Sequence, residues 1–267
     1  MDEIINLGEY WDEGKLVQSR EEITTATNLN SRYFALAYSL LQEARVVFDR
    51  WSSCYEEVVE PLERNRVTRS LVERIFHRTP DNPPRCRNNP RHLFASAITP
   101  GGITTHLASL VDKGYTLHQV KGNPGTGVDK ILSAVSSLAE FLGMQVQNYH
   151  NPFIPEHLEA VILPDIAVAV VDTSGWIVNT AEPLTVHPSK SCICLDDLVD
   201  SSRLARFSHE IEDARTRFSA CLAGAISCIR NAKEVHDRLE EFYIPAMDFT
   251  GVEIKRRETR ERILALL

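Results

Sequence analysis

The feature that most constrains the fold is an internal repeat of about 57 residues. Shifting the chain by 188 positions aligns residues 5–61 with residues 193–249 without a gap. Roughly sixteen positions are identical, several times the number expected by chance. Two copies of one structural unit therefore flank the middle of the chain, and the fold must accommodate both.

Each copy of the repeat has the pattern of a long amphipathic helix. Apolar residues recur at steps of three and four, and no Gly or Pro lies between Lys15 and Pro61. At 1.5 Å per residue, roughly 45 residues would span about 65 Å. We expect the first helix either to form an arm of a hairpin or to bend near Asn28–Asn30.

Between the two copies, short apolar runs alternate with helical stretches, among them the segment 103–114. This alternation predicts an α/β core with a parallel sheet covered on both faces. The chain then divides into four parts. They are a helical unit (1–78), a Pro- and Asn-rich linker (79–90), an α/β core (91–188) and a helical tail that completes the core's domain (189–267).

The charge balance opposes contact with nucleic acid. The net charge is −8 and the isoelectric point is near 5.6, so a phosphate backbone would be repelled. An arginine-rich stretch between Pro61 and Arg91 is better explained as a solvated helix face and linker than as a docking surface. No apolar run is long enough to cross a membrane, and the acidic first residues differ from a signal peptide. We expect a cytoplasmic protein with no membrane or nucleic-acid partner.

A glycine-rich segment between a predicted strand and a predicted helix is the main candidate for a binding site. Such a loop turns backbone NH groups inward around an anion, and the following helix adds its positive end. Phosphate suits this arrangement, although a tight structural turn would use the same residues. The candidate binding residues are Gly122, Asn123, Pro124, Gly125, Thr126, Gly127, Val128 and Asp129.

An acidic residue at the end of a second predicted strand strengthens the phosphate interpretation. The apolar run 168–171 ends in Asp172, about 45 residues past the glycine-rich segment. This is the pattern by which an aspartate holds Mg²⁺ beside a nucleotide, directly or through water. Asp172 is therefore the candidate metal ligand.

The order of several motifs resembles a group of bacterial P-loop ATPases of unknown role. The motifs are LFASAITPGG, GNPGTG, NYH, AVILPDIAVAVVD and EFYIPAMDF. Members of that group carry two tandem nucleotide-binding cores, each followed by a long helical tail. The resemblance implies a P-loop NTPase-like three-layer core with ATP and Mg²⁺ as cofactors. It also implies that residues 1–78 are the tail of a first core that is missing here.

Two departures from that pattern argue against full activity. Val128 stands where the family has a phosphate-binding lysine, and Asp129 stands where it has a Ser or Thr that ligates Mg²⁺. Each charge change is worth roughly 3 kcal/mol at about 6 Å in a medium of dielectric 20. Lys130 is expected to point away from the loop. We expect weak nucleotide binding and weak or absent hydrolysis.

Two other functions remain open. The helical units could pair with each other, with a second copy or with a partner chain, which would make the protein a non-enzymatic assembly or regulatory module. An active ATPase or kinase with a rearranged site is the third possibility. Among other residues, His157 and Glu159 have no spacing that supports a hydrolytic triad. Asp196 and Asp197 are expected to lie on a solvated face or at a helix start.

Overall fold

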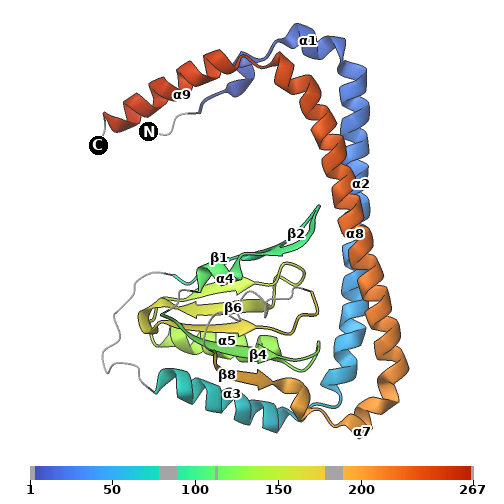
Figure 1. Ribbon diagram of the computed structural model, residues 1–267, viewed down its shortest axis with the longest axis vertical. Coiled ribbons are helices and arrows are strands. Elements are labelled where there is room, and N and C mark those ends of the chain that lie inside the picture. Colours follow the sequence, from blue (N-terminus) through green and yellow to red (C-terminus); the bar gives the residue numbers. More distant parts are fainter. Residues whose placement is uncertain (1–3, 78–88, 112–113, 178–188, 266–267) are drawn as a thin grey trace. The chain divides into compact units, whose positions relative to one another are not determined.

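The structure is a computed structural model, and it falls into two compact units. Unit 1 comprises residues 1–38 and 227–267, and unit 2 comprises residues 39–226. Two long helices, α2 (Arg20–Glu56) and α8 (Ser208–Tyr243), each contribute one part to each unit (Figure 1). The described residues are 4–77, 89–111, 114–177 and 189–265.

The repeat found in the sequence is also a repeat of elements. The 188-residue shift carries α2 onto α8 with a difference of one residue at the end of the helix. It carries α3 (Pro61–Phe76) onto α9 (Phe249–Leu264) with identical bounds. The remaining matched elements are η1 (Leu7–Tyr10) with η3 (Leu195–Leu198), and α1 (Glu13–Gln18) with α7 (Ser201–Leu204) and η4 (Ala205–Phe207).

The long helix of the first copy begins later than its pattern suggests. Asp12 caps α1 by accepting a hydrogen bond from the Lys15 NH. The helical conformation is interrupted at Ser19, and α2 starts at the next residue. Helix α2 then continues through Asn28–Asn30 for 37 residues in all. Its length is therefore about 55 Å.

Unit 2 contains a six-stranded, mostly parallel sheet in the order β1-β5-β6-β7-β4-β8. The prediction of a parallel sheet is wrong for β6, which runs antiparallel to both of its neighbours. A short turn at Pro164–Ile166 joins β6 to β7 and leaves no length for a parallel crossover. The strands are β1 (Arg91–Leu93), β4 (Thr116–Lys121), β5 (Gln147–His150), β6 (Leu158–Leu163), β7 (Val168–Asp172) and β8 (Ser189–Cys194).

The two faces of this sheet are covered differently. Helices α3 and α5 (Val128–Phe141) pack on one face in a single apolar cluster (Figure 1). The other face packs against α4 (Leu107–Leu110), which is only one turn long. Among the described residues of the helix expected over 103–114, only this one turn is helical. Residues 103–105 belong instead to β3 (Gly102–Thr105), which pairs with β2 (Ser96–Thr99) in a hairpin, because Gly102 turns the chain at φ 114° and β-branched residues follow.

An aromatic cluster joins the unit 2 parts of α2 and α8. The Phe48 and Phe218 rings lie 6.1 Å apart between centroids, and both are at most 3% exposed. Trp51, Phe153 and Trp176 complete the cluster. Burying such rings stabilises the helix pair, because each side chain removes a large apolar area from water.

Unit 1 is held together by backbone contacts between the start of the first copy and the end of the second. The Asp12 NH donates to the Ala246 carbonyl at 2.7 Å, and the Asp248 NH donates to the Tyr10 carbonyl at 2.8 Å. A bridge pairs Trp11 with Met247. The equivalent bridge in unit 2 pairs Val199 with Val59, which are the same two positions after the 188-residue shift.

None of the helices in the described residues is long and apolar enough to span a bilayer. Most of the expected linker 79–90 falls outside the described residues, so the division at that segment stays a prediction. The five cysteines in the described part of the chain are free thiols.

Replacing a ring of the aromatic cluster tests its contribution to stability. Phe218→Ala should lower the free energy of unfolding by about 3–5 kcal/mol, because it leaves a cavity among four rings. Phe141→Ala is the control, since that ring is 85% exposed, and its effect should stay within about 0.5 kcal/mol. Urea unfolding followed by circular dichroism measures both. Equal losses in the two variants would contradict the assignment.

Candidate functional site

The candidate loop, residues 122–129, lies where the sequence places it. It leaves the end of β4 and leads into the first turn of α5, so it occupies a strand-to-helix junction. Gly125 and Gly127 have φ angles of 88° and 99°, a conformation that side chains disfavour. We call these eight residues the glycine loop.

Asp172 also lies where it was expected. Strand β7 pairs in parallel with β4, and Asp172 stands opposite Val120 at the carboxyl end of both strands. The Ser174 NH donates to the Asp172 carboxylate at 2.8 Å, and the Gly122 NH donates to the Ser174 hydroxyl at 3.0 Å. Ser174 therefore links the candidate metal ligand to the start of the glycine loop.

The protein itself satisfies part of the glycine loop's hydrogen-bonding capacity. The buried Thr126 hydroxyl donates to the Asn123 carbonyl at 2.7 Å and closes the turn. The Asn123 backbone and side-chain amides both donate to the Asp196 carboxylate, at 2.9 and 3.0 Å. Of the two expectations for Asp196, the helix start is confirmed, because the residue lies in the first turn of η3. Its carboxylate is also an anion bound by the loop.

Two helices of the first repeat copy cover the glycine loop. A Cβ atom on Gly125 would overlap the Ser52 carbonyl oxygen of α2. A Cβ atom on Gly127 would lie 2.6 Å from Cδ of Arg64, at the start of α3. The α2 backbone leaves no room for a side chain at Gly125, whereas at Gly127 the positive φ and the overlying Arg64 side chain favour glycine. The sides of the loop that face α2 and α3 are therefore closed by protein.

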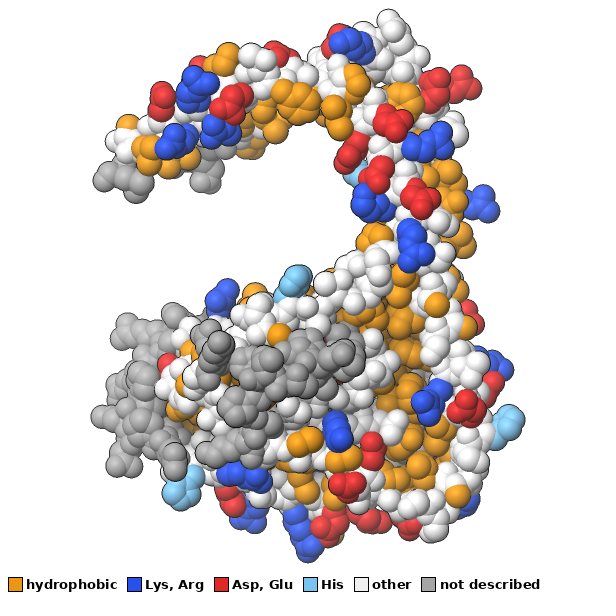
Figure 2. Space-filling model, in the orientation of Figure 1, with side chains coloured by type: hydrophobic (Ala, Val, Ile, Leu, Met, Phe, Trp, Pro, Cys, Tyr) orange, Lys and Arg blue, Asp and Glu red, His pale blue; other side chains and the backbone are white. Residues whose placement is uncertain are grey.

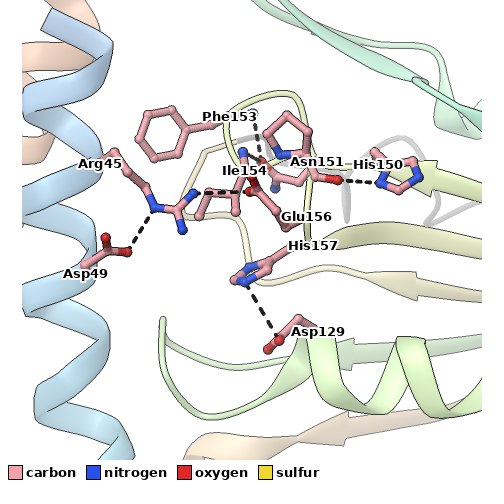
Figure 3. Close-up of polar contacts among 10 residues, drawn as sticks. Arg45, Asp49, Asp129, His150, Asn151, Phe153, Ile154, Glu156 and His157 are labelled. Atoms are coloured by element: carbon pink, nitrogen blue, oxygen red, sulfur yellow. Dashed lines mark hydrogen bonds and ion pairs between the residues drawn. The ribbon is translucent and has the colours of Figure 1, made fainter.

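The three residues that follow the glycines point in different directions. Val128 is 7% exposed and belongs to the apolar cluster under α5. The Asp129 carboxylate lies 3.8 Å from Nε2 of His157 (Figure 3). The Lys130 ammonium lies 3.8 Å from the Glu56 carboxylate of α2 and does not line the cavity at the loop, as expected. No lysine therefore occupies the phosphate-binding position.

The β5–β6 connection positions His157 above Asp129 (Figure 3). The Asn151 side-chain oxygen accepts the NH groups of Phe153 and Ile154, which fixes the turn. Arg45 of α2 donates to the Glu156 carboxylate at 3.2 Å and ties the same connection to the helix. His157 is thereby held at one side of the glycine loop.

Two acidic groups behind the loop have raised pKa values. Burial raises the pKa of Asp172 to about 6, against hydrogen bonds from Ser174, and the nearby Asp129 raises it further. Burial also raises the pKa of Glu159 to about 7. The Ser96 hydroxyl donates to one Glu159 oxygen at 2.6 Å, while the other oxygen has no hydrogen-bond partner among the described residues. Glu159 is 3% exposed, so protonation relieves the cost of burying its charge.

The space at the glycine loop does not fit ATP with Mg²⁺ in this arrangement. The cavity measures about 30 Å³, room for little more than one water molecule. Its walls carry the carboxylates of Asp129 and Asp172, which suit Mg²⁺ but repel a triphosphate. Within the described residues, no group of three or more His, Cys, Asp or Glu side chains is arranged to hold a metal ion.

Comparison of the chain with known protein families, with curated proteins and with solved structures found no match in any of the three.

Several residues of the site could not be found from local pattern. Ser52 and Arg64 reach the loop from helices more than 55 positions earlier in the chain. Glu159 was considered only for a triad, which its position on β6 does not support. The one available signal was Gly125 and Gly127 themselves, because glycines in a βα turn indicate that something approaches the backbone closely.

The contact between α2 and the loop predicts the cost of a side chain at Gly125. Gly125→Ala should destabilise the protein by more than Gly143→Ala, because both residues have positive φ but only Gly125 has a neighbour within reach. The control should lose about 1–2 kcal/mol from backbone strain alone. Chemical unfolding of the two variants measures the difference. A loss in Gly125→Ala no larger than in the control would mean that α2 does not rest on the loop.

The raised pKa of Glu159 predicts a pH dependence of stability. The folded state keeps its proton up to about pH 7, whereas the unfolded chain releases it near pH 4.5. The free energy of unfolding should therefore fall as pH rises through this range. Glu159→Gln, which keeps an acceptor for Ser96, should remove about 2.5 kcal/mol of the fall between pH 5 and pH 8.

Urea unfolding at the two pH values measures the effect. Glu21→Gln, at an exposed position of α2, is the control for loss of one carboxylate. An unchanged slope in Glu159→Gln would contradict the buried, protonated state of this residue.

Proposed function

We propose that this chain is a P-loop NTPase-like protein whose nucleotide site has degenerated. ATP with Mg²⁺ would bind weakly, and hydrolysis would be weak or absent. The observation that carries the proposal is the position of the glycine loop between β4 and α5, with Asp172 at the end of the neighbouring parallel strand. A nucleotide-binding core needs this combination of an anion-binding turn and an adjacent acid.

The charges at the loop support the loss of tight binding. Val128 packs into the core instead of offering a cation, and Asp129 adds a carboxylate beside Asp172. Without the lysine, the charge that develops on a transferred phosphoryl group has no counterpart at this position. A candidate cation is Arg64, whose side chain lies over Gly127. Arg64 is the residue we expect to carry any residual phosphate binding.

The packing of α2 against the loop supports a second candidate function. The Ser52 carbonyl packs directly against Gly125, so the loop also forms a packing surface for α2 of the first helical unit. A triphosphate would have to displace this helix. A non-enzymatic assembly or regulatory role, in which the core holds the helices in place, uses the loop as it stands.

Removing the added negative charge tests the proposed function. The natural chain should show no saturable binding of Mg·ATP below about 1 mM in titration calorimetry. Asp129→Ser should bind more tightly, by up to about 100-fold, because roughly 3 kcal/mol of repulsion is lost. Adding Val128→Lys should increase affinity again. Since Val128 is buried, the single variant keeps the test valid if the double variant does not fold.

The controls separate the alternatives. Asp197→Ser removes an exposed carboxylate next to Asp196 and should leave affinity unchanged. Arg64→Ala in the Asp129→Ser background should abolish the gain. Folded variants that all fail to bind would favour the assembly role, and steady ATP turnover by the natural chain would favour an active enzyme with a rearranged site.

A further inference from the structure

Unit 1 contains an open apolar groove beside α9. The groove has a volume of about 540 Å³ and is floored by Ile5, Leu7, Val252, Ile263 and Leu264. Leu7 is 48% exposed and Ile263 is 56% exposed, although both are large and apolar. Figure 2 shows hydrophobic side chains along α9, with Lys and Arg side chains beside them. Apolar surface gathered in this way is typical of an interaction site.

The equivalent positions in unit 2 show what such a groove covers. The 188-residue shift carries Leu7 onto Leu195 and relates Ile263 to Ile75. Leu195 is 0% exposed and Ile75 is 5% exposed. Both belong to the apolar cluster formed with α5 and one face of the sheet. The same surface is thus buried against an α/β core in unit 2 and exposed in unit 1.

The backbone segment next to the groove corresponds, after the 188-residue shift, to the edge strand β8 of the sheet. Ile193 and Cys194 of β8 pair in parallel with Val120 and Lys121 of β4. Their counterparts are Ile5 and Asn6, which belong to no strand in the part of the chain that the structure describes. This short segment is therefore placed to add to the edge of another sheet, beside the groove.

We propose that the groove of unit 1 binds a second α/β core of the same design as residues 91–188. Residues 4–6 would extend the sheet of that core beside its β4-like strand. A helix equivalent to α5 would fill the groove between residues 5–7 and α9. The inference rests on the internal repeat and does not depend on nucleotide binding.

A second copy of this chain does not provide that surface. Its own β4 edge is already paired with β8, and its own α5 is already packed against α3. The β4 edge would have to separate from β8, and α5 from α3, before unit 1 of another copy could bind these surfaces. The occupant is therefore a separate core domain.

The charged residues at the rim of the groove indicate how the surface of the second core should differ from that of residues 91–188. Lys255 and Arg260 line the groove, whereas the equivalent residues of α3 are Val67 and Val72, which pack against the apolar cluster. A cationic rim favours a partner with carboxylates at the matching positions. The second core should carry acidic residues where α5 presents apolar ones.

Hydrogen exchange of the natural chain is the first test. Because the groove is open, amides of α9 should exchange at least about ten times faster than the equivalent amides of α3. The comparison is internal, since the two helices have the same length and the same position in the repeat. Equal protection in dilute protein would overturn the proposal.

Supplying a core is the second test. Residues 79–188 are copied ahead of residue 1 of the full chain, and Lys255→Val, Thr259→Leu and Arg260→Val give α9 the side chains of α3. Exchange of α9 should slow by at least about tenfold relative to the same triple variant without the copied core. Ile263→Asp should abolish this protection. Unchanged exchange would overturn the proposal.

Two further outcomes would assign the groove to another occupant. A concentration-dependent dimer of the natural chain that Ile263→Asp disrupts, measured by light scattering, would identify a second copy. Binding to vesicles of phosphatidylserine and phosphatidylcholine that is lost in a Lys255→Glu, Arg260→Glu variant would identify a membrane surface. Either result would overturn the proposal of a second core.

Discussion

The arrangement of unit 2 depends on one close contact between backbones. The Ser52 carbonyl of α2 rests on Gly125, and no side chain separates the helix from the glycine loop. The contact sets the distance between α2 and the loop at the start of α5. The aromatic cluster around Phe48 then holds α8 against α2. It also determines how little space remains beside Asp129 and Asp172.

An internal carboxylate takes the place of an external anion at the loop, and a side chain covers the loop from outside. The Asp196 carboxylate accepts the Asn123 amides, and the Arg64 side chain covers Gly127. A turn rich in NH groups needs a negative partner or water, because unsatisfied amides are costly when buried. The second repeat copy supplies that partner from η3, and the first copy supplies the cover from α2 and α3. Both copies therefore meet at the loop.

Local patterns in the sequence were sufficient for the parts of the fold that repeat or that need glycine. The 188-residue repeat predicted matching helices, and the glycines together with Asp172 predicted a strand-to-helix turn with an acid beside it. The antiparallel direction of β6 was missed because it depends on a three-residue turn, not on the apolar pattern of the strand. The contacts of Ser52 and Arg64 were missed because tertiary packing between distant segments leaves no periodic signal. Whether the loop accepts a nucleotide depends on those contacts, which leave no local signal in the sequence.

The pairing of α2 with α8 has a consequence for biosynthesis. Phe48 and Phe218, which meet in the aromatic cluster, are 170 positions apart, since 218 minus 48 is 170. At typical elongation rates the ribosome needs on the order of 10 to 30 seconds to translate that interval. Throughout this time the apolar stripe of α2 has no α8 to cover it, while the sheet is still being made. The nascent chain thus exposes an apolar helix face early, and this face stays without α8 through most of translation, which is the period in which chaperones would have to protect it.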